Sequence, residues 1–135
     1  MFANIYDGKR VLVTGHTGFK GSWLCLWLSE LGAEVSGASL PPKTKHNHWN
    51  LINLGIDDHR CDIRDPIHVE RVIKKVQPQI VFHLAAQPLV RHSYKDPLET
   101  WSTNVMGTVN VLEACRRTPS VKAIVAITSD KCYEN

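Results

Sequence analysis

Short runs of apolar residues alternate along the chain with longer segments whose apolar positions recur every three or four residues. The runs have the length and β-branched content of buried strands, and the longer segments have helical periodicity. The predicted strands lie at residues 11–13, 33–40, 59–63, 79–84 and 121–127. The predicted helices lie at residues 22–31, 66–76 and 96–117, with a further short helix near residues 49–54.

Local signals mark where these helices begin and end. Gly32 follows the first helix at a C-cap position, Pro66 stands in the first turn of the next, and Gly107 is a weak point inside the longest. The last run, 121–127, is apolar almost throughout, as expected inside a parallel sheet. Strands that alternate with helices indicate βαβ units. We therefore predict an α/β fold, a Rossmann-type doubly wound parallel sheet with helices on both faces, truncated after about strand five.

Composition restricts the class of protein without deciding its function. The chain has 135 residues, of which 43% are hydrophobic and 21% charged, as is typical of one globular domain. No apolar run approaches the roughly 18 residues of a membrane span, and residues 1–10 lack a signal-peptide pattern, so we expect a cytoplasmic protein. The net charge is +3 and the basic residues are scattered, which indicates no nucleic-acid or membrane partner.

The four cysteines indicate neither a metal site nor a disulfide framework. Cys25, Cys61, Cys115 and Cys132 form no C-x-x-C pair, and their spacing matches no zinc motif. We therefore expect free thiols that behave as small apolar residues, and no metal.

A glycine-rich segment lies directly between the first predicted strand and the first predicted helix. Gly15, Gly18 and Gly21 have the spacing G-x-x-G-x-x-G. The first glycine allows a sharp turn, the second lets backbone approach a pyrophosphate, and the third lets the helix pack closely on the sheet. The helix N-terminus then offers N–H groups and a partial positive charge to the phosphates. In this context the motif favours a dinucleotide site over a turn that serves only the backbone.

The position that would distinguish NAD from NADP is not acidic. Many dinucleotide sites carry an acid at the end of strand two, where it binds the ribose, but here the strand ends at Ser39 and Leu40. Glu34 opens that strand instead of ending it, and Lys43 and Lys45 could meet a 2′-phosphate. The residues alone leave NAD and NADP open.

Two further features lie at the carboxyl ends of later strands, where ligands bind in this fold class. Asp62 could accept a hydrogen bond from the adenine amino group, or could cap the next helix together with Asp65. Ala85 and Ala86 are small enough for a cofactor to lie against them, although helix packing would also favour small residues there. Both interpretations of each feature stay open.

These segments together resemble the extended short-chain dehydrogenase/reductase family. Four segments match in the family's order: T-G-x-x-G-x-x-G at 14–21, an acid at 62, small residues at 83–86 and N-x-x-G-T at 104–108. The resemblance covers essentially the whole chain. It implies NAD as the favoured cofactor, with NADP as the open alternative, bound by Gly15, Thr17, Gly18, Phe19, Lys20, Gly21, Asp62, Ile63, Leu84, Ala85, Ala86, Asn104 and Thr128.

Within that family the chain is most similar to the sugar-nucleotide dehydratases, and among them to the branch that acts on CDP-glucose. Residues 15–24, 85–91 and 127–133 carry this similarity. Related dehydratases typically have Thr-Asp-Glu where this chain has Ser129, Asp130 and Lys131, and the lysine fits the CDP-glucose branch. The implied reaction moves hydride from C4 of the glucose to NAD, removes water across C5 and C6, and returns the hydride to C6, giving the CDP-4-keto-6-deoxy sugar.

The resemblance also implies roles for individual residues. Asp130 and Lys131 would carry the protons of the elimination, and Ser129 would bind the C4 oxygen. Lys131 could act as a base only if burial or nearby positive charge lowered its pKa; without the resemblance, a solvated turn is the simpler interpretation. Gln87 and Arg91 are candidate substrate-binding residues, Arg91 for a phosphate of the sugar nucleotide or, equally, as a surface arginine.

The family's Tyr-x-x-x-Lys pair is absent from these 135 residues. Four places after Tyr6 and Tyr94 stand Arg10 and Leu98, and Tyr133 is too close to residue 135. We therefore expect residues 1–135 to be the N-terminal dinucleotide-binding part of a longer enzyme, without the substrate domain and inactive alone. The apolar positions of the longest helix, 98, 101, 105, 109 and 112, either form a dimer interface in the parent, as in family members, or pack against the sheet.

Two alternatives keep the same cofactor site. A sugar-nucleotide epimerase or reductase of the same family would share these motifs and differ in its reaction. A non-catalytic dinucleotide-binding module would use the glycine-rich turn without turnover.

Overall fold

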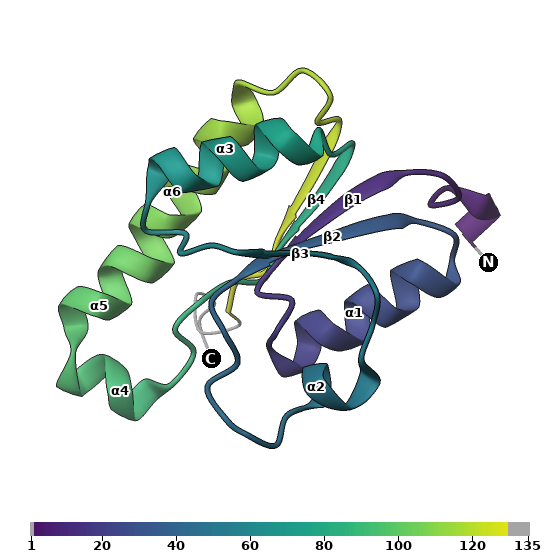
Figure 1. Cartoon of the computed structure of the whole chain (residues 1–135). Helices are drawn as coiled ribbons and strands as arrows, with labels where there is room; N and C mark the ends of the chain where they lie inside the picture. Colours follow the sequence, from purple (N-terminus) through teal and green to yellow (C-terminus); the bar gives the residue numbers. More distant parts are fainter. Residues whose placement is uncertain (1, 130–135) are drawn as a thin grey trace.

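The predicted apolar runs lie side by side in one parallel sheet (Figure 1). The computed structural model describes residues 2–129. The sheet has five strands in the order β3-β2-β1-β4-β5, and every pair of neighbours is parallel. This order is that of a Rossmann-type doubly wound sheet, so the predicted fold class is confirmed. The strands are β1 (Arg10–Thr14), β2 (Glu34–Ser39), β3 (Asp57–Arg60), β4 (Ile80–His83) and β5 (Ala123–Ala126).

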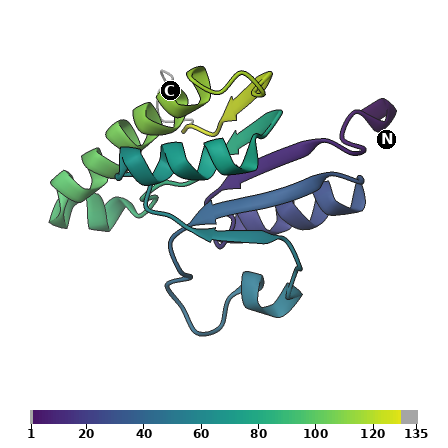
Figure 2. The same cartoon turned by 45° about the horizontal axis from the view of Figure 1, so that its top comes forward.

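Helices cover both faces of the sheet, as Figures 1 and 2 show together. α1 (Phe19–Glu30) and α2 (His48–Ile52) lie on one face, and α3 (Pro66–Val76) and α6 (Gly107–Arg116) lie on the other. The remaining helical segments are η1 (Phe2–Asn4), α4 (Val90–Lys95), α5 (Pro97–Trp101) and η2 (Ser102–Met106). Within residues 2–129, none of the helices has the length and apolar content needed to cross a membrane.

The core has two halves because successive side chains of a strand point to opposite faces. Val11 and Val13 of β1 pack with Cys25 and Leu28 of α1. Leu12 points the other way and joins the cluster contributed mainly by α3 and α6. Each fully buried aliphatic side chain contributes about 1.5–3 kcal/mol to folding, so β1 is held in the centre of the sheet from both sides.

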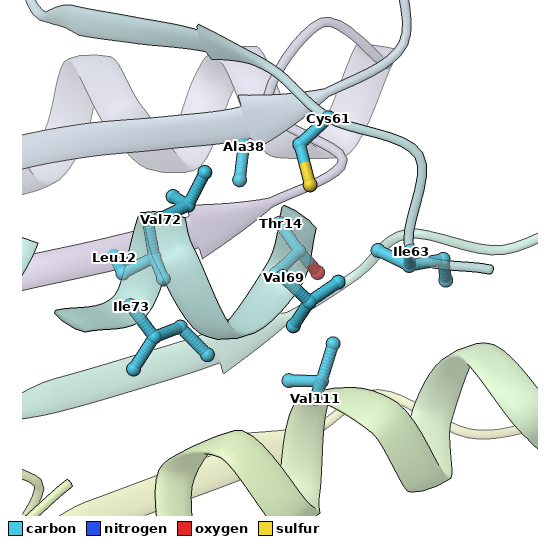
Figure 3. Close-up of a pocket in the computed structure, with 9 residues that line it drawn as sticks. All are labelled: Leu12, Thr14, Ala38, Cys61, Ile63, Val69, Val72, Ile73 and Val111. Atoms are coloured by element: carbon cyan, nitrogen blue, oxygen red, sulfur yellow. The ribbon is translucent and has the colours of Figure 1, made fainter. Parts of the chain in front are cut away.

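The half of the core beside α3 and α6 is closely packed. Figure 3 shows its cavity, which has a volume of about 10 Å³ and holds no more than about one water molecule. A cavity of that size cannot contain a nucleotide, so any ligand site lies outside the core. The lining residues are Leu12, Thr14, Ala38, Cys61, Ile63, Val69, Val72, Ile73 and Val111.

The cysteines within residues 2–129 are buried free thiols, as predicted. Burial raises the pKa of Cys25 to about 12. Burial also raises the pKa of Cys61 and of Cys115 to about 11. These thiols are therefore un-ionised at neutral pH and serve as small apolar core residues. Cys132 lies outside the described residues.

Helix α3 has the predicted bounds because its signals are local. The Asp65 carboxylate accepts hydrogen bonds from the backbone N–H groups of Ile67 and His68, at 3.0 and 3.1 Å. Pro66 occupies the first helical position, where its missing N–H costs nothing. At the other end Gln77 adopts a left-handed conformation and closes the helix.

Strand β3 occupies residues 57–60 instead of the predicted 59–63. It lies at an edge of the sheet, where Asp57 and Asp58 are exposed and give no apolar signal. The chain turns away at Asp62, whose carbonyl accepts a hydrogen bond from the Asp65 N–H. The exposed edge explains why the apolar pattern placed this strand too late.

The longest predicted helix is three segments in series, α5, η2 and α6. The middle segment, η2, is a π-helix, a rare form that is frequent at functional sites. A Cβ at Gly107 would lie 2.5 Å from Ile63 Cδ1, so glycine allows α6 to approach the turn after β3. Helix α4, which the sequence pattern does not predict, precedes this series.

Strand β5 is not buried, which corrects the expectation that residues 121–127 lie inside the sheet. In the described part of the chain, β5 pairs only with β4 and forms the edge of the sheet. All four of its residues are exposed. Its apolar composition therefore does not reflect burial within residues 2–129.

Candidate functional site

The first glycine of the motif is required by the geometry of the turn that follows β1. Gly15 has φ +75°, in the left-handed region that favours glycine. A Cβ there would also lie 2.7 Å from Ala85 N and 2.9 Å from the Leu84 carbonyl carbon. The turn therefore passes directly against the segment that follows β4.

The other two positions of the motif are occupied by glycine for different reasons. A Cβ at Gly21 would lie 2.2 Å from Gly15 O, so α1 can pack against the turn only without a side chain there. Gly18 has an ordinary φ of −76°, is exposed, and a Cβ would meet Gly15 O at 3.2 Å. The fold makes a much weaker demand for glycine at 18 than at 15 or 21, which leaves close approach of a ligand as the stronger reason.

The N-terminus of α1 is open toward this side of the turn. Gly18 is its N-cap residue, and no side chain of residues 2–129 caps the helix. The first N–H groups of a helix have no partner within it, so those of α1 can donate to an anion. Phe19 and Lys20 stand exposed in this first turn.

Thr17 and His16 fix the turn to neighbouring strands. The Thr17 hydroxyl donates to Leu40 O at 2.9 Å and lies 2.8 Å from Ser39 Oγ, at the end of β2. The His16 ring is fully buried, and its Nε2 lies 2.9 Å from an Asp58 carboxylate oxygen of β3. Burial lowers the pKa of His16, against the opposing effect of Asp58.

His16 is a site-forming residue that the sequence motif does not identify. A Cβ at Gly37 would lie 2.3 Å from the His16 ring, so β2 accommodates this ring only because residue 37 is glycine. Trp49 of α2 packs against the His16 ring in an edge-to-face contact with 4.7 Å between ring centroids. A glycine inside a predicted strand indicates close approach of another group, and Gly37 is the signal that could have revealed His16.

The end of β2 carries no acid that could bind a ribose. Ser39 is buried with its hydroxyl against Thr17, while Lys43 and Lys45 are exposed in the following loop. Glu34 begins β2 and so lies at the amino end of the strand, away from this site, as predicted. This part of the structure is compatible with either dinucleotide.

Asp62 is held by Arg64 and does not cap a helix. Two guanidinium nitrogens of Arg64 donate to its carboxylate, at 2.6 and 3.0 Å. The hydrogen bond from Arg64 holds the pKa of Asp62 below its usual range. Asp65 alone caps α3, so the capping interpretation of Asp62 is wrong. Ile63 is buried beside it, against Gly107.

The segment after β4 is tied to the π-helix. The Asn104 side chain accepts from Gln87 N at 2.7 Å and donates to Gln87 O at 3.0 Å. The buried Gln87 side chain accepts from Leu89 N at 2.7 Å and donates to Thr100 Oγ1 at 2.9 Å. Gln87 therefore shapes the loop that leads to Arg91, which is exposed in the first turn of α4.

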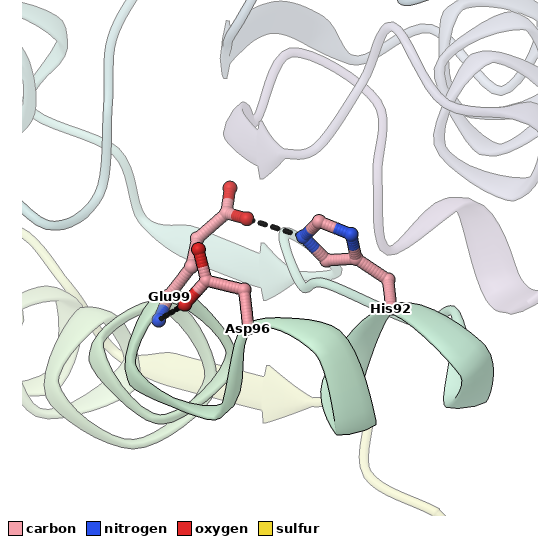
Figure 4. Close-up of side chains that lie close together, drawn as sticks. All are labelled: His92, Asp96 and Glu99. Atoms are coloured by element: carbon pink, nitrogen blue, oxygen red, sulfur yellow. Dashed lines mark hydrogen bonds and ion pairs between the residues drawn. The ribbon is translucent and has the colours of Figure 1, made fainter.

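Another polar cluster lies at the junction of α4 and α5. Figure 4 shows His92 paired with Glu99 and Asp96 beside them. The three side chains bring possible metal-ligand atoms within 4.8 Å of one another. Asp96 already caps α5 by accepting from Glu99 N at 2.9 Å, and the positive charge of Arg64 lies close enough to interact with both acids. These contacts at the junction of α4 and α5 are sufficient to explain why the three side chains lie together.

A hollow of about 310 Å³ lies near the amino ends of the strands, at the other end of the sheet from the glycine-rich turn. Its lining includes Tyr6, Asp7 and Gly32, near the start of β1 and the end of α1. Ligands of doubly wound sheets bind at the carboxyl ends of the strands. The turn at 15–21, the end of β2 and the segment 84–87 meet at that carboxyl end and form the candidate site.

The sequence matches one described family over most of its length. Residues 12–133 match the family described as GDP-mannose 4,6 dehydratase. The chain belongs to this family. The resemblance to the extended short-chain dehydrogenase/reductases that the motifs indicated is thereby confirmed, with similarity to its sugar-nucleotide dehydratases and epimerases.

Individual relatives agree with this assignment. The chain is 54% identical over 134 residues to a CDP-glucose 4,6-dehydratase of Salmonella typhimurium, covering 98% of this chain and 37% of that protein. An epimerase from Methanothermobacter thermautotrophicus matches with a TM-score of 0.83 and 34% identity, covering 94% of this chain and 37% of the other. A UDP-glucose 4-epimerase of Thermus thermophilus in complex with NAD matches with a TM-score of 0.75 and 36% identity, covering 88% and 37%. The chain thus spans less than half the length of these relatives.

In this member of the GDP-mannose 4,6-dehydratase family, the predicted catalytic segment follows β5. The Ile127 N–H donates to His83 O at 3.0 Å. The hydrogen bonding between β5 and β4 therefore extends to the carboxyl end of β4. Thr128 and Ser129 follow and are exposed. Asp130 and Lys131 lie outside the described residues. Residues 127–129 therefore leave the sheet next to β4, on the side where Leu84 and Ala85 lie against the turn.

Proposed function

We propose that the chain is the dinucleotide-binding part of an NAD-dependent sugar-nucleotide 4,6-dehydratase that acts on CDP-glucose. The observation that supports CDP-glucose as the substrate is the 54% identity to the Salmonella CDP-glucose 4,6-dehydratase. The difference in identity supports the choice, because four curated sugar-nucleotide epimerases and dehydratases that act on other substrates are 32–34% identical, and the NAD-bound Thermus epimerase is 36% identical.

The residues at the carboxyl edge fit a dinucleotide. The exposed Gly18 leaves room for a pyrophosphate, and the uncapped N-terminus of α1 offers N–H donors. Four structural relatives of the chain are described as NAD complexes. We therefore propose NAD as the cofactor, with the pyrophosphate at Gly15–Gly21, the adenine near Asp62 and Ile63, and the nicotinamide side toward residues 84–86, Asn104 and Thr128.

The reaction assigns specific tasks to side chains of the chain. Bound NAD supplies a reversible hydride acceptor. Ser129 holds the C4 oxygen of the sugar, and Asp130 and Lys131 transfer protons at the C6 hydroxyl and at C5, as loss of water requires. Removal of the C4 hydroxyl proton is assigned to a Tyr-x-x-x-Lys pair outside residues 1–135. We therefore propose that residues 1–135 bind the cofactor without turnover.

The substrate is assigned to the loop that follows β4. Arg91 is exposed and can reach a phosphate of the sugar nucleotide. Gln87 contributes by setting the course of this loop, because both of its amide hydrogens already have protein acceptors. Arg91 thus binds substrate directly, and Gln87 holds the loop from which it extends.

We also propose that the full-length protein is a homo-oligomer. The apolar positions of the helix series were expected either to form an interface or to pack against the sheet. They are exposed here, from 82% for Leu98 and 67% for Trp101 to 38% for Val105. Large apolar side chains gathered on an exposed helix face are typical of an interaction surface.

The reaction is tested by incubating the full-length protein with NAD and CDP-glucose and measuring the alkaline absorbance of a 4-keto sugar. We expect product from CDP-glucose and much less from UDP-glucose or GDP-mannose. Inversion of UDP-glucose at C4 without loss of water would favour the epimerase, the alternative that the structural relatives support. Binding of NAD without conversion of any sugar nucleotide would favour a non-catalytic module.

A further inference from the structure

A buried histidine at the end of β4 joins parts of the site that are far apart in sequence. His83 is 3% exposed. Its Nδ1 lies 2.7 Å from Thr14 Oγ1 at the end of β1, and its Nε2 lies 3.0 Å from Thr108 Oγ1 in α6. The ring therefore connects the strand that enters the glycine-rich turn with the helix that follows the π segment.

The protonated nitrogen of this ring follows from counting donors and acceptors. Thr14 Oγ1 accepts hydrogen bonds from the N–H groups of Leu84 and Ala85, at 3.1 and 3.2 Å. The Leu84 N–H also lies 3.2 Å from the Thr14 carbonyl oxygen, which shares this donor. A hydroxyl has two acceptor lone pairs and one hydrogen. Because N–H groups face both lone pairs of Thr14 Oγ1, we assign the hydroxyl hydrogen to the bond with His83 Nδ1. The ring is then neutral, with its hydrogen on Nε2.

The hydrogen bonds continue beyond the His83 ring with the same donor-to-acceptor direction. His83 Nε2–H donates to Thr108 Oγ1, and the Thr108 hydroxyl donates to Asn104 O at 2.7 Å. Asn104 belongs to the π-helix. Its side-chain amide accepts a hydrogen bond from Gln87 N and donates one to Gln87 O. All hydrogens in this chain point from Thr14 toward Asn104, so no member is left without a partner.

We propose that His83, in its Nε2–H form, is a positioning residue that fixes the loop at Gln87 relative to the glycine-rich turn. This proposal rests on the proposed function in one respect, that cofactor lies on the turn and substrate on the loop. His83 touches neither ligand. Burial lowers its pKa, which agrees with a neutral ring.

The tautomer is tested on the wild-type chain with ¹⁵N-labelled histidine and long-range ¹H–¹⁵N NMR spectra. His83→Gln identifies the signal of His83 by removing it. We expect an unprotonated Nδ1 and a protonated Nε2 for His83 at neutral pH. A proton on Nδ1 would overturn the proposal, because Thr14 Oγ1 would then receive three donors.

The positioning role is tested with two matched variants at Thr108. Thr108→Val removes the hydroxyl at nearly constant volume, and Thr108→Ser retains it. Loss of one buried hydrogen bond changes an opening equilibrium by about 5- to 30-fold, so we expect hydrogen exchange at the Gln87 and Leu89 amides to speed up by that factor in Thr108→Val and to stay near wild type in Thr108→Ser. Unchanged exchange in Thr108→Val, or equal acceleration in both variants, would overturn the proposal.

Further measurements separate this proposal from the proposed function. If Thr108→Val does not fold, His83→Asn replaces it, since its amide can accept from Thr14 but cannot reach Thr108, and the same exchange increase is expected. NAD added to wild type should slow exchange at Gln87, and Thr108→Val should weaken that effect. Failure of wild type to bind NAD would refute the cofactor assignment, whereas the tautomer and the exchange results decide the role of His83 by themselves.

Discussion

Replacing Gly18 by alanine separates the cofactor role of the glycine-rich turn from its role in folding. The new methyl group would lie 3.2 Å from Gly15 O, so a shift of a few tenths of an ångström accommodates it. The φ of −76° suits alanine. We therefore expect the free energy of unfolding to change by less than about 1 kcal/mol, the usual scale for such a helix-cap substitution.

The same methyl group stands where the pyrophosphate must approach the backbone. Loss of one hydrogen bond to a charged phosphate costs about 1.5–3 kcal/mol, which corresponds to roughly 10- to 100-fold weaker binding. Isothermal titration with NAD measures the affinity, and urea denaturation measures the stability. By contrast, Gly21→Ala would bring a Cβ within 2.2 Å of Gly15 O and destabilise the fold itself.

Gly55→Ala is the matched control, because a Cβ at Gly55 meets no atom within 4 Å. We expect Gly55→Ala to bind NAD like wild type. Gly18→Ala with wild-type affinity, or an equal loss in both variants, would refute the assignment of Gly18 to the pyrophosphate.

Three further predictions concern stability. Asp65→Ala removes the cap of α3 and should lower the free energy of unfolding by about 1 kcal/mol in urea denaturation; an unchanged value would mean that the cap contributes nothing. Gly107→Ala should cost about 1–3 kcal/mol because its Cβ would meet Ile63 at 2.5 Å, and combination with Ile63→Ala should recover part of that cost; strictly additive losses would contradict the clash. Burial lowers the pKa values of His16 and His83 below the 6.5 of the unfolded chain, so the unfolded state binds more protons and stability should fall as pH drops below about 6.5. Denaturation midpoints that stay level between pH 7 and 5.5 would contradict the buried neutral rings.

The features that were predicted correctly depend on residues close together in sequence. Helix α3 is delimited by Asp65 and Pro66 at its start, and both signals act within one turn. Gly15 and Gly21 are explained by the motif itself, although the closest contact of Gly21 is with the Gly15 carbonyl. Local chemistry therefore sufficed for the turn, for α3 and for the order of strands and helices.

The features that escaped prediction depend on distant partners. The π-helix is tied to the β4 loop through Asn104 and Gln87, and it leads into α6, which approaches Ile63 at Gly107. The burial of His16 depends on Gly37, a strand away. No pattern of apolar residues reports such contacts, because they join polar groups or glycines from separate elements.

The most direct test of the dinucleotide site is a map of NAD binding on the ¹⁵N-labelled chain. We predict saturable shifts of the amide signals of Gly15 to Ser22 and of Ala85 and Ala86, with smaller effects from NADP. Absence of shifts at millimolar NAD would contradict the account. Shifts confined to the hollow near Tyr6, Asp7 and Gly32 would contradict it equally.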